Sequence, residues 1–161
     1  MFMHFSKISG FVRKTPMPIK MGLPAFAVGI VLGVSGPVLA AVTSSAIGYY
    51  GPIDGYNYEN QADLSLSGGI FVPETAVSTQ QGASTPAGYM GCNARLFNTN
   101  TGALVQQSGM IYDNSSGNNF SVEQDDLTSR TGSYYSYGIT AAYNGNGYDY
   151  YYTFKSPSLT N

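Results

Sequence analysis

Hydrophobic and polar residues alternate along much of the chain after residue 40. The clearest example is YNYENQADLSLS, residues 56–67, where tyrosine, alanine and leucine share one side with Asn60 while the other side is polar. A period of two places successive side chains on opposite faces of a β-strand. We therefore predict a long, half-buried strand here. The chain after residue 40 has no apolar stripe with a period of 3.6 residues, so no amphipathic helix is expected in it.

Clusters of glycine, asparagine, serine and proline divide the rest of this region into further short strands. Gly68-Gly69 ends the first strand, and Pro73 in the next one indicates a bulge, a break or an edge position. We expect strands at 70–79, 89–97, 103–112 and around 120–122, separated by turns or loops at 80–88, 98–102, 113–119 and 123–132.

The C-terminal part of the chain predicts an aromatic β-hairpin. SYYSYGITAAY (133–143) and YDYYYTFK (148–155) are joined by NGNG, and asparagine and glycine tolerate the positive φ of tight turns. A pairing in which residue numbers sum to 291 makes one face apolar and aromatic and the other nearly polar. This apolar side of the hairpin is predicted to point into the core. Its main members are Tyr137, Ile139, Tyr150, Tyr152 and Phe154.

The same pairing leaves Tyr134 and Tyr151 on the outer face of the hairpin. These two rings are the candidate binding residues. Single exposed tyrosines are also common on ordinary surfaces, so the structural alternative stays open.

About seven short antiparallel strands predict an all-β domain. A single β-sandwich is favoured over a small barrel, because nothing in the pattern indicates a central ligand cavity.

The first 40 residues have the layout of a secretory signal peptide. A basic segment precedes the uncharged stretch 21–40, which ends with Gly36-Pro37 and small residues before a cleavage site between Ala40 and Ala41. A membrane anchor is the alternative, since about 20 apolar residues can cross a bilayer. Repeated glycine and proline disfavour a permanent helix. The expected organisation is therefore a signal peptide at 1–40 and a secreted domain at 41–161.

Cleavage at this point would change the charge of the protein. Four of the seven basic residues lie in the leader, and all nine acidic residues follow it, so three bases against nine acids leave a formal charge of −6. Three scattered bases cannot neutralise many phosphates, so no nucleic-acid partner is expected. Anionic membrane surfaces are disfavoured for the same reason.

The side chains after residue 40 exclude several kinds of catalysis. The only histidine is His4, and the only cysteine is Cys92. A Ser-His-Asp triad, a zinc site of His and Cys ligands and a disulfide framework are all excluded. A carboxylate pair could cleave a glycosidic bond, but no spacing selects one. We therefore predict no catalytic residue, metal site or cofactor.

Cys92 itself has apolar neighbours at two-residue spacing, Met90, Ala94 and Leu96. This pattern predicts a buried thiol. An intermolecular disulfide is the alternative for an unpaired cysteine in an oxidising compartment.

The segments PAGYMGCNARLFN, TGALVQQSG and YYSYGITAAYNGNGYDYYYTFKSPSL are similar to those of uncharacterised small secreted all-β proteins of Gram-positive bacteria. The resemblance implies export and carries no activity over to this chain.

Together these observations predict a secreted, non-catalytic extracellular module that binds a glycan, cell-wall material or a surface protein. A small antimicrobial or toxin-like effector and a carboxylate hydrolase are the alternatives, and nothing in the sequence specifies an oligomeric state.

Overall fold

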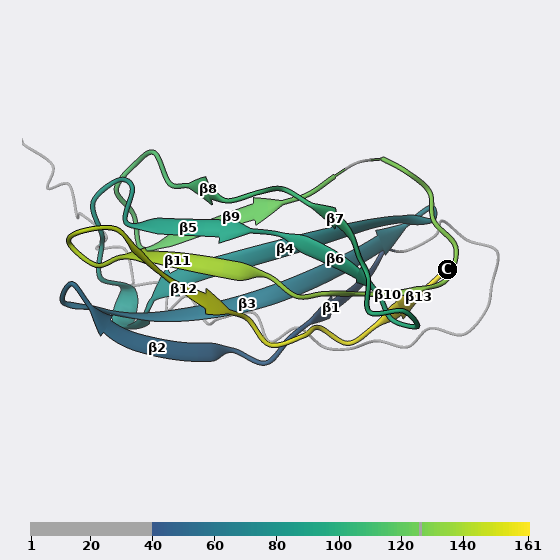
Figure 1. Ribbon diagram of the computed structural model, residues 1–161, viewed down its shortest axis with the longest axis horizontal. Helices are drawn as coiled ribbons and strands as arrows, with labels where there is room; N and C mark the ends of the chain where they lie inside the picture. The colour runs from purple at the N-terminus through teal and green to yellow at the C-terminus, as the bar shows by residue number, and fades with distance from the viewer. Residues whose placement is uncertain (1–39, 126) are drawn as a thin grey trace, which may run out of the picture. The chain divides into compact units, whose positions relative to one another are not determined.

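The computed structural model describes residues 40–161 with the exception of residue 126. This part of the chain is built from antiparallel strands in three open sheets, without an α-helix (Figure 1). A single 3-10 turn, Gln80–Gly82, lies in the expected loop 80–88. The prediction of an all-β fold is confirmed. The predicted leader lies outside the described residues, except for Ala40.

The first sheet contains the longest strands. In it β4 pairs along its whole length with β3, and β9 lies on the far side of β4. The strands β1 and β2 pair one after the other with the free edge of β3. Its strands are β1 (Ala41–Ser44), β2 (Gly48–Ile53), β3 (Tyr56–Ser67), β4 (Ile70–Thr79) and β9 (Asn119–Glu123).

The strands β3 and β4 agree with the sequence pattern. Alternate residues of β3 from Tyr58 to Leu64 are buried, as predicted. The register with β4 runs without a bulge through Leu64 and Pro73. The Pro73 carbonyl accepts a hydrogen bond from the Gln124 N–H, directly beyond the end of β9. Pro73 therefore lies where the β4–β9 ladder ends, a position in which its missing N–H breaks no strand pairing.

The two other sheets have four strands each. One has the order β13-β10-β6-β7 and the other the order β12-β11-β5-β8. Their bounds are β13 (Leu159–Thr160), β10 (Ser133–Ser136), β6 (Arg95–Asn98) and β7 (Leu104–Gln107), and β12 (Tyr148–Tyr152), β11 (Ile139–Tyr143), β5 (Met90–Asn93) and β8 (Ile111–Tyr112).

Three of the predicted strands are each divided between these two sheets. Residues 89–97 become β5 and β6, residues 103–112 become β7 and β8, and residues 133–143 become β10 and β11. These three divisions, together with β1, β2 and β13, which the sequence pattern does not predict, give the described residues thirteen strands instead of about seven. Alternation continues through the breaks in residues 89–97 and 133–143, which is why these two breaks leave little trace in the hydrophobic pattern.

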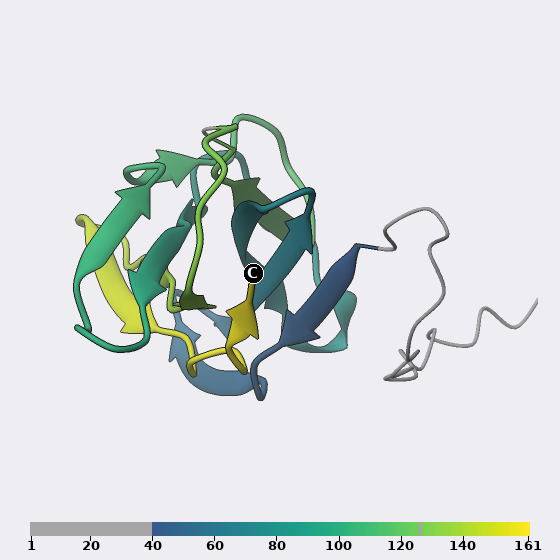
Figure 2. The ribbon, with the colours of Figure 1, turned by 90° about the vertical axis from the view of Figure 1, so that its right-hand side faces the viewer.

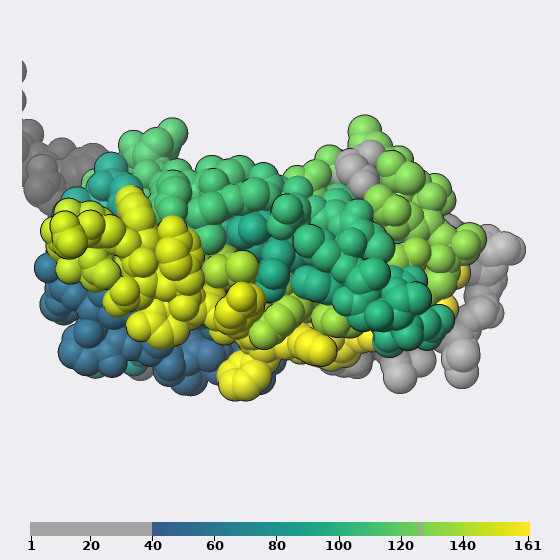
Figure 3. Space-filling model, viewed as in Figure 1, coloured from purple at the N-terminus to yellow at the C-terminus, as the bar shows by residue number. Residues whose placement is uncertain are grey.

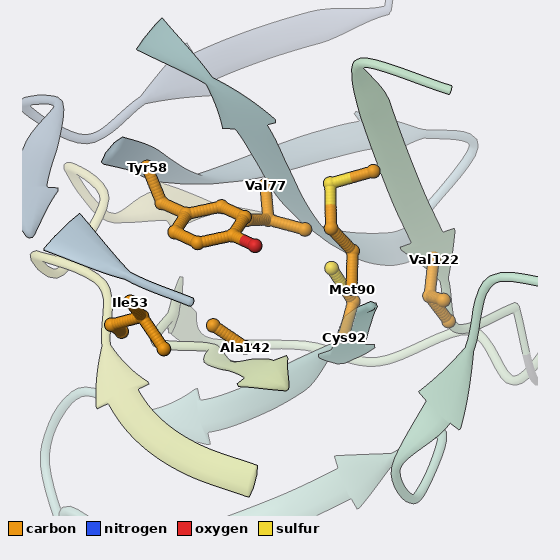
Figure 4. Packing of buried hydrophobic residues seen from close by; sticks show 7 residues of the cluster. All are labelled: Ile53, Tyr58, Val77, Met90, Cys92, Val122 and Ala142. Atoms are coloured by element: carbon orange, nitrogen blue, oxygen red, sulfur yellow. The ribbon is translucent and has the colours of Figure 1, made fainter. Parts of the chain in front are cut away.

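The first sheet lies opposite the other two, and the core fills the space between them. Figure 2 shows this arrangement from one end, with the first sheet on the right. One apolar cluster contains Tyr58 and Val77 from the first sheet and Met90, Cys92 and Ala142 from the opposite layer (Figure 4). A second cluster contains Leu64, Phe71, Leu96 and Tyr134.

The predicted hairpin has the correct register but the wrong orientation. Its strands β11 and β12 pair Ile139 with Tyr152 and Tyr143 with Tyr148, so that residue numbers sum to 291. The face predicted to be internal points outward, with Tyr150 56% and Tyr152 59% exposed. Phe154, just beyond β12, is also exposed, and Tyr137 and Ile139 are only half-buried.

The rings of β2 and β3 explain this orientation. Tyr50 and Tyr58 extend into the space between the layers and stack on each other with ring centroids 5.5 Å apart. The Tyr50 hydroxyl hydrogen-bonds that of Thr140 at 3.0 Å, and the Asn60 amide donates to the same hydroxyl at 3.0 Å. The space next to β11 is thus occupied by rings from the first sheet. The small side chains of Thr140 and Ala142 fit there, and larger ones would not.

Candidate aromatic binding face

The outer side of the two smaller sheets carries a set of tyrosine and phenylalanine rings that we call the aromatic face. Its members alternate with buried residues such as Leu96, Tyr134 and Ser136, so they point away from the core. Figure 3 views this side of the molecule, with the yellow atoms of residues 148–155 next to the teal and green atoms of β5, β6 and β7. The aromatic face consists of Phe97, Tyr112, Tyr135, Tyr137, Tyr148, Tyr150 and Tyr152, together with Arg95 and Lys155.

The rings contact one another across strands from both sheets. Tyr137 stacks on Tyr152 with centroids 5.4 Å apart, and Phe97 lies 6.0 Å from Tyr137. Phe97 in turn stacks on Tyr135 at 5.4 Å. These contacts hold each ring against its neighbours, so little side-chain entropy remains to be lost on binding a ligand.

A second group of rings continues the surface over β8 and β12. Tyr112 lies 4.4 Å from Tyr148, and the hydroxyls of Tyr112 and Tyr150 are hydrogen-bonded at 3.3 Å. Gly91 is needed beneath this group, because a Cβ atom there would lie 2.7 Å from the Tyr112 ring. The hydrogen bond to Tyr150 and, to a smaller extent, partial burial raise the pKa of Tyr112 to about 12. The Tyr112 phenol therefore stays protonated and can donate a hydrogen bond at neutral pH.

Arg95 lies among the rings of the aromatic face. Its guanidinium carbon is 5.1 Å, 5.2 Å and 5.3 Å from the ring centroids of Phe97, Tyr137 and Tyr152. The Nε–H donates to the Tyr137 carbonyl at 2.9 Å. These distances are those of cation–π contacts. Burial lowers the pKa of Arg95, while the nearby tyrosines oppose that shift.

Lys155 supplies a second cation at the edge of the same surface. Its exposed ammonium lies 4.9 Å from the Tyr135 ring centroid and 5.8 Å from that of Tyr137. The aromatic face thus combines exposed rings, phenol hydroxyls and two positive charges.

The two binding residues predicted from the sequence are not part of this surface. Tyr134 is only 8% exposed, packs on Phe71 at 4.7 Å and donates its hydroxyl to the Thr131 carbonyl. Tyr151 is half-buried and stacks on Tyr50 at 4.0 Å. They belong to different sheets and pack against different core clusters. Their predicted outward orientation is wrong, because the layers face each other through the side of the hairpin that carries Tyr151.

The opposite surface of the molecule is acidic. Asp63, Glu74 and Glu123 are paired residues on three adjacent strands of the first sheet. Burial raises the pKa of Glu74, a hydrogen bond with Ser121 opposes the shift, and the neighbouring Asp63 and Glu123 add to it. A small hollow nearby is lined by Ile47, Glu59, Asn60, Gln61, Ala76 and Ser78.

In the region from residue 40 onward, leaving out residue 126, no group of three or more His, Cys, Asp or Glu residues has an arrangement suited to a metal ion. The described residues also contain no helix with the length and hydrophobicity that a membrane crossing requires.

Comparison with known proteins found no matching protein-family model, curated protein or solved structure. The function is therefore inferred from the chemistry of the site itself.

Proposed function

We propose that the protein is a secreted, non-catalytic β-sandwich module that binds polysaccharide through its aromatic face. The observation that carries this proposal is the exposure of Tyr150 and Tyr152, each more than half accessible within a ladder of contacting rings. A folded domain usually buries rings of this size, since each removes roughly 150–250 Å² of surface from water. Large exposed aromatic surfaces commonly mark binding sites.

The chemistry of the aromatic face favours a sugar as the ligand. A pyranose ring has one or two faces of C–H groups and a rim of hydroxyls. Tyrosine offers the matching pair of groups, a ring for the C–H face and a phenol that donates and accepts hydrogen bonds. Tyr137 and Tyr152 provide both next to each other. The openness of the surface suits a chain of sugars better than a small molecule, which is usually enclosed in a concave pocket.

The experiment is a binding assay with variants of the exposed rings. Affinity electrophoresis through gels that contain single soluble polysaccharides, together with pull-down on insoluble ones and on peptidoglycan, should identify retarding polymers. The double variant Tyr150→Ala/Tyr152→Ala should then bind at least about tenfold more weakly, as expected when two central aromatic contacts are removed.

Tyr49→Ala is the matched control. Tyr49 is 66% exposed but lies on β2 of the first sheet, outside the aromatic face. It should bind like the unchanged protein. The proposal would be refuted if the double variant bound as tightly as the unchanged protein. It would also be refuted if the unchanged protein bound none of the polysaccharides tested.

A further inference from the structure

We propose that the polysaccharide is anionic and that Arg95 and Lys155 hold its carboxylate or phosphodiester groups. This inference rests on the proposed function and specifies the chemical class of its ligand. It follows from the position of these two cations, from their lack of acidic partners and from the distribution of the acidic residues.

Arg95 has a buried donor, Nη2, that no described group uses. Its Nε–H is bonded to the Tyr137 carbonyl, but Nη2 has no hydrogen-bond partner among the described residues, and the surrounding rings cover it. A guanidinium has five N–H donors in a planar fork that matches a carboxylate or phosphate. A half-buried charge without a counter-ion is costly, so an anion bound beside Arg95 would offset part of that cost.

The two cations are also concentrated on this surface to an unusual degree. The chain after residue 40 has three basic residues and nine acidic ones, and two of the three bases lie on the aromatic face. Neither is in an ion pair with a described carboxylate; their close partners are rings. A net-negative chain therefore has two of the three basic residues that follow residue 40 next to the rings of the aromatic face.

Three of the nine acidic residues lie on the far side of the core from the aromatic face. Asp63, Glu74 and Glu123 are on the outer side of the first sheet, behind the core as seen from the aromatic face. Packed sheets are about 10 Å apart, whereas charges in physiological salt are screened over about 8 Å. These three carboxylates are therefore largely screened from Arg95 and Lys155.

A purely structural role for the cations predicts something different. If Arg95 and Lys155 only stabilise the ring ladder through cation–π contacts, the affinity for a polysaccharide should not depend on the charge of that polysaccharide. The comparison of charged and neutral forms of one polymer separates these two roles.

Polygalacturonate and alginate would each be compared with their carboxyl-reduced forms, which keep the backbone and lose the charge. A phosphodiester-bearing wall polysaccharide before and after removal of phosphate with hydrofluoric acid provides the phosphate arm. At least one charged polymer should bind on the order of tenfold more tightly than its neutral counterpart, since charge-assisted hydrogen bonds are the stronger ones. This preference should weaken when salt is raised.

Lys155→Gln should reduce binding of the charged polymer about threefold, as expected for one exposed charge contact, and should lower the preference for the charged over the neutral form by a similar factor. Lys155→Arg should restore binding. Arg130→Gln is the matched control, since it removes the same formal charge outside the aromatic face. The backbone N–H of Arg130 donates to the Gly69 carbonyl in the β3–β4 turn, and this variant should bind the charged polymer like the unchanged protein.

Equal binding of charged and neutral forms, or no effect of Lys155→Gln, would overturn the inference while leaving polysaccharide binding intact. If none of these polymers is bound but neutral polysaccharides are, the inference also fails. If no polysaccharide is bound at all, both proposals fail.

Discussion

At the scale of single residues, the approach of the two layers is set by Gly138. This glycine lies between β10 and β11 and faces the buried Thr75 on β4. A Cβ atom at position 138 would overlap the Thr75 side chain and lie 2.8 Å from its Cβ atom. The Gly138 N–H donates to the Thr153 hydroxyl at 3.0 Å within its own layer, and the Thr75 hydroxyl donates to the Asn93 carbonyl at 3.3 Å across the layers. The layers are therefore in direct contact here, with no space for a side chain at position 138.

Gly138→Ala is predicted to destabilise the domain by about 1–3 kcal/mol, the usual cost of an extra methyl group in a packed interior. Urea denaturation followed by tyrosine fluorescence would measure the change in the free energy of unfolding. Gly147→Ala is the matched control, since a Cβ atom there meets no atom within 4 Å and the backbone does not have a positive φ. Equal stability of the two variants would contradict the close packing at Gly138.

At the scale of elements, local pattern predicted pairing better than it predicted orientation. The bounds of β3 and β4 and the register of the β11–β12 hairpin all follow from alternation and from turn residues. Which hairpin face is internal depends on Tyr50 and Tyr58, rings that are some 80 to 100 residues away in sequence. No local pattern contains that information. Hydrophobicity alone predicts that the more apolar face of the hairpin is internal, and this prediction is wrong.

The division of predicted strands has a similar origin. Residues 89–97 keep their alternation through Ala94, yet β5 and β6 pair with strands of different sheets. Ser108 forms hydrogen bonds with both the N–H and the carbonyl of Ala94, and so replaces strand pairing at the break. Ser108 is 14 residues from Ala94 in the chain, and the alternation of apolar and polar residues around Ala94 does not indicate that this partner is there.

The corrected orientation of the hairpin makes a testable prediction about stability. Tyr151→Ala removes a ring that stacks on Tyr50 and packs against the core, and should lower the free energy of unfolding by about 2–4 kcal/mol. Tyr152→Ala removes a largely exposed ring from the adjacent position and should cost about 1 kcal/mol or less. Chemical denaturation of both variants compares them. A larger loss for Tyr152→Ala would mean that the internal and external faces are exchanged.

At the scale of the whole molecule, the candidate site exists only because two sheets lie side by side. Arg95 and Phe97 come from β6, Tyr137 follows β10, and Tyr152 ends β12. The sequence shows that aromatic residues are abundant after residue 40. It does not show that these residues meet, because their separations in the chain reach 57 positions and the contacts cross a sheet boundary.

The packing of the layers also determines the behaviour of Cys92, whose predicted burial is confirmed. The thiol lies in β5 between the two layers, is fully inaccessible to solvent and is unpaired. Its Sγ is 3.6 Å from the Phe120 carbonyl, and burial is the main cause that raises the pKa of the thiol. A reagent can reach it only when the layers separate, and the thiolate that reacts is then formed in the open state.

The native protein should therefore react with a thiol reagent such as 5,5′-dithiobis(2-nitrobenzoate) at least about a thousandfold more slowly than the urea-unfolded chain, since a domain of ordinary stability opens that rarely. It should run as a monomer on a non-reducing denaturing gel. Gly138→Ala should speed labelling in proportion to its loss of stability, which ties the thiol to global opening and not to a local movement of β5. Stoichiometric labelling of the native protein within seconds, or a dimer that reducing agent dissociates, would show that Cys92 is accessible and that the layers are not closed over it.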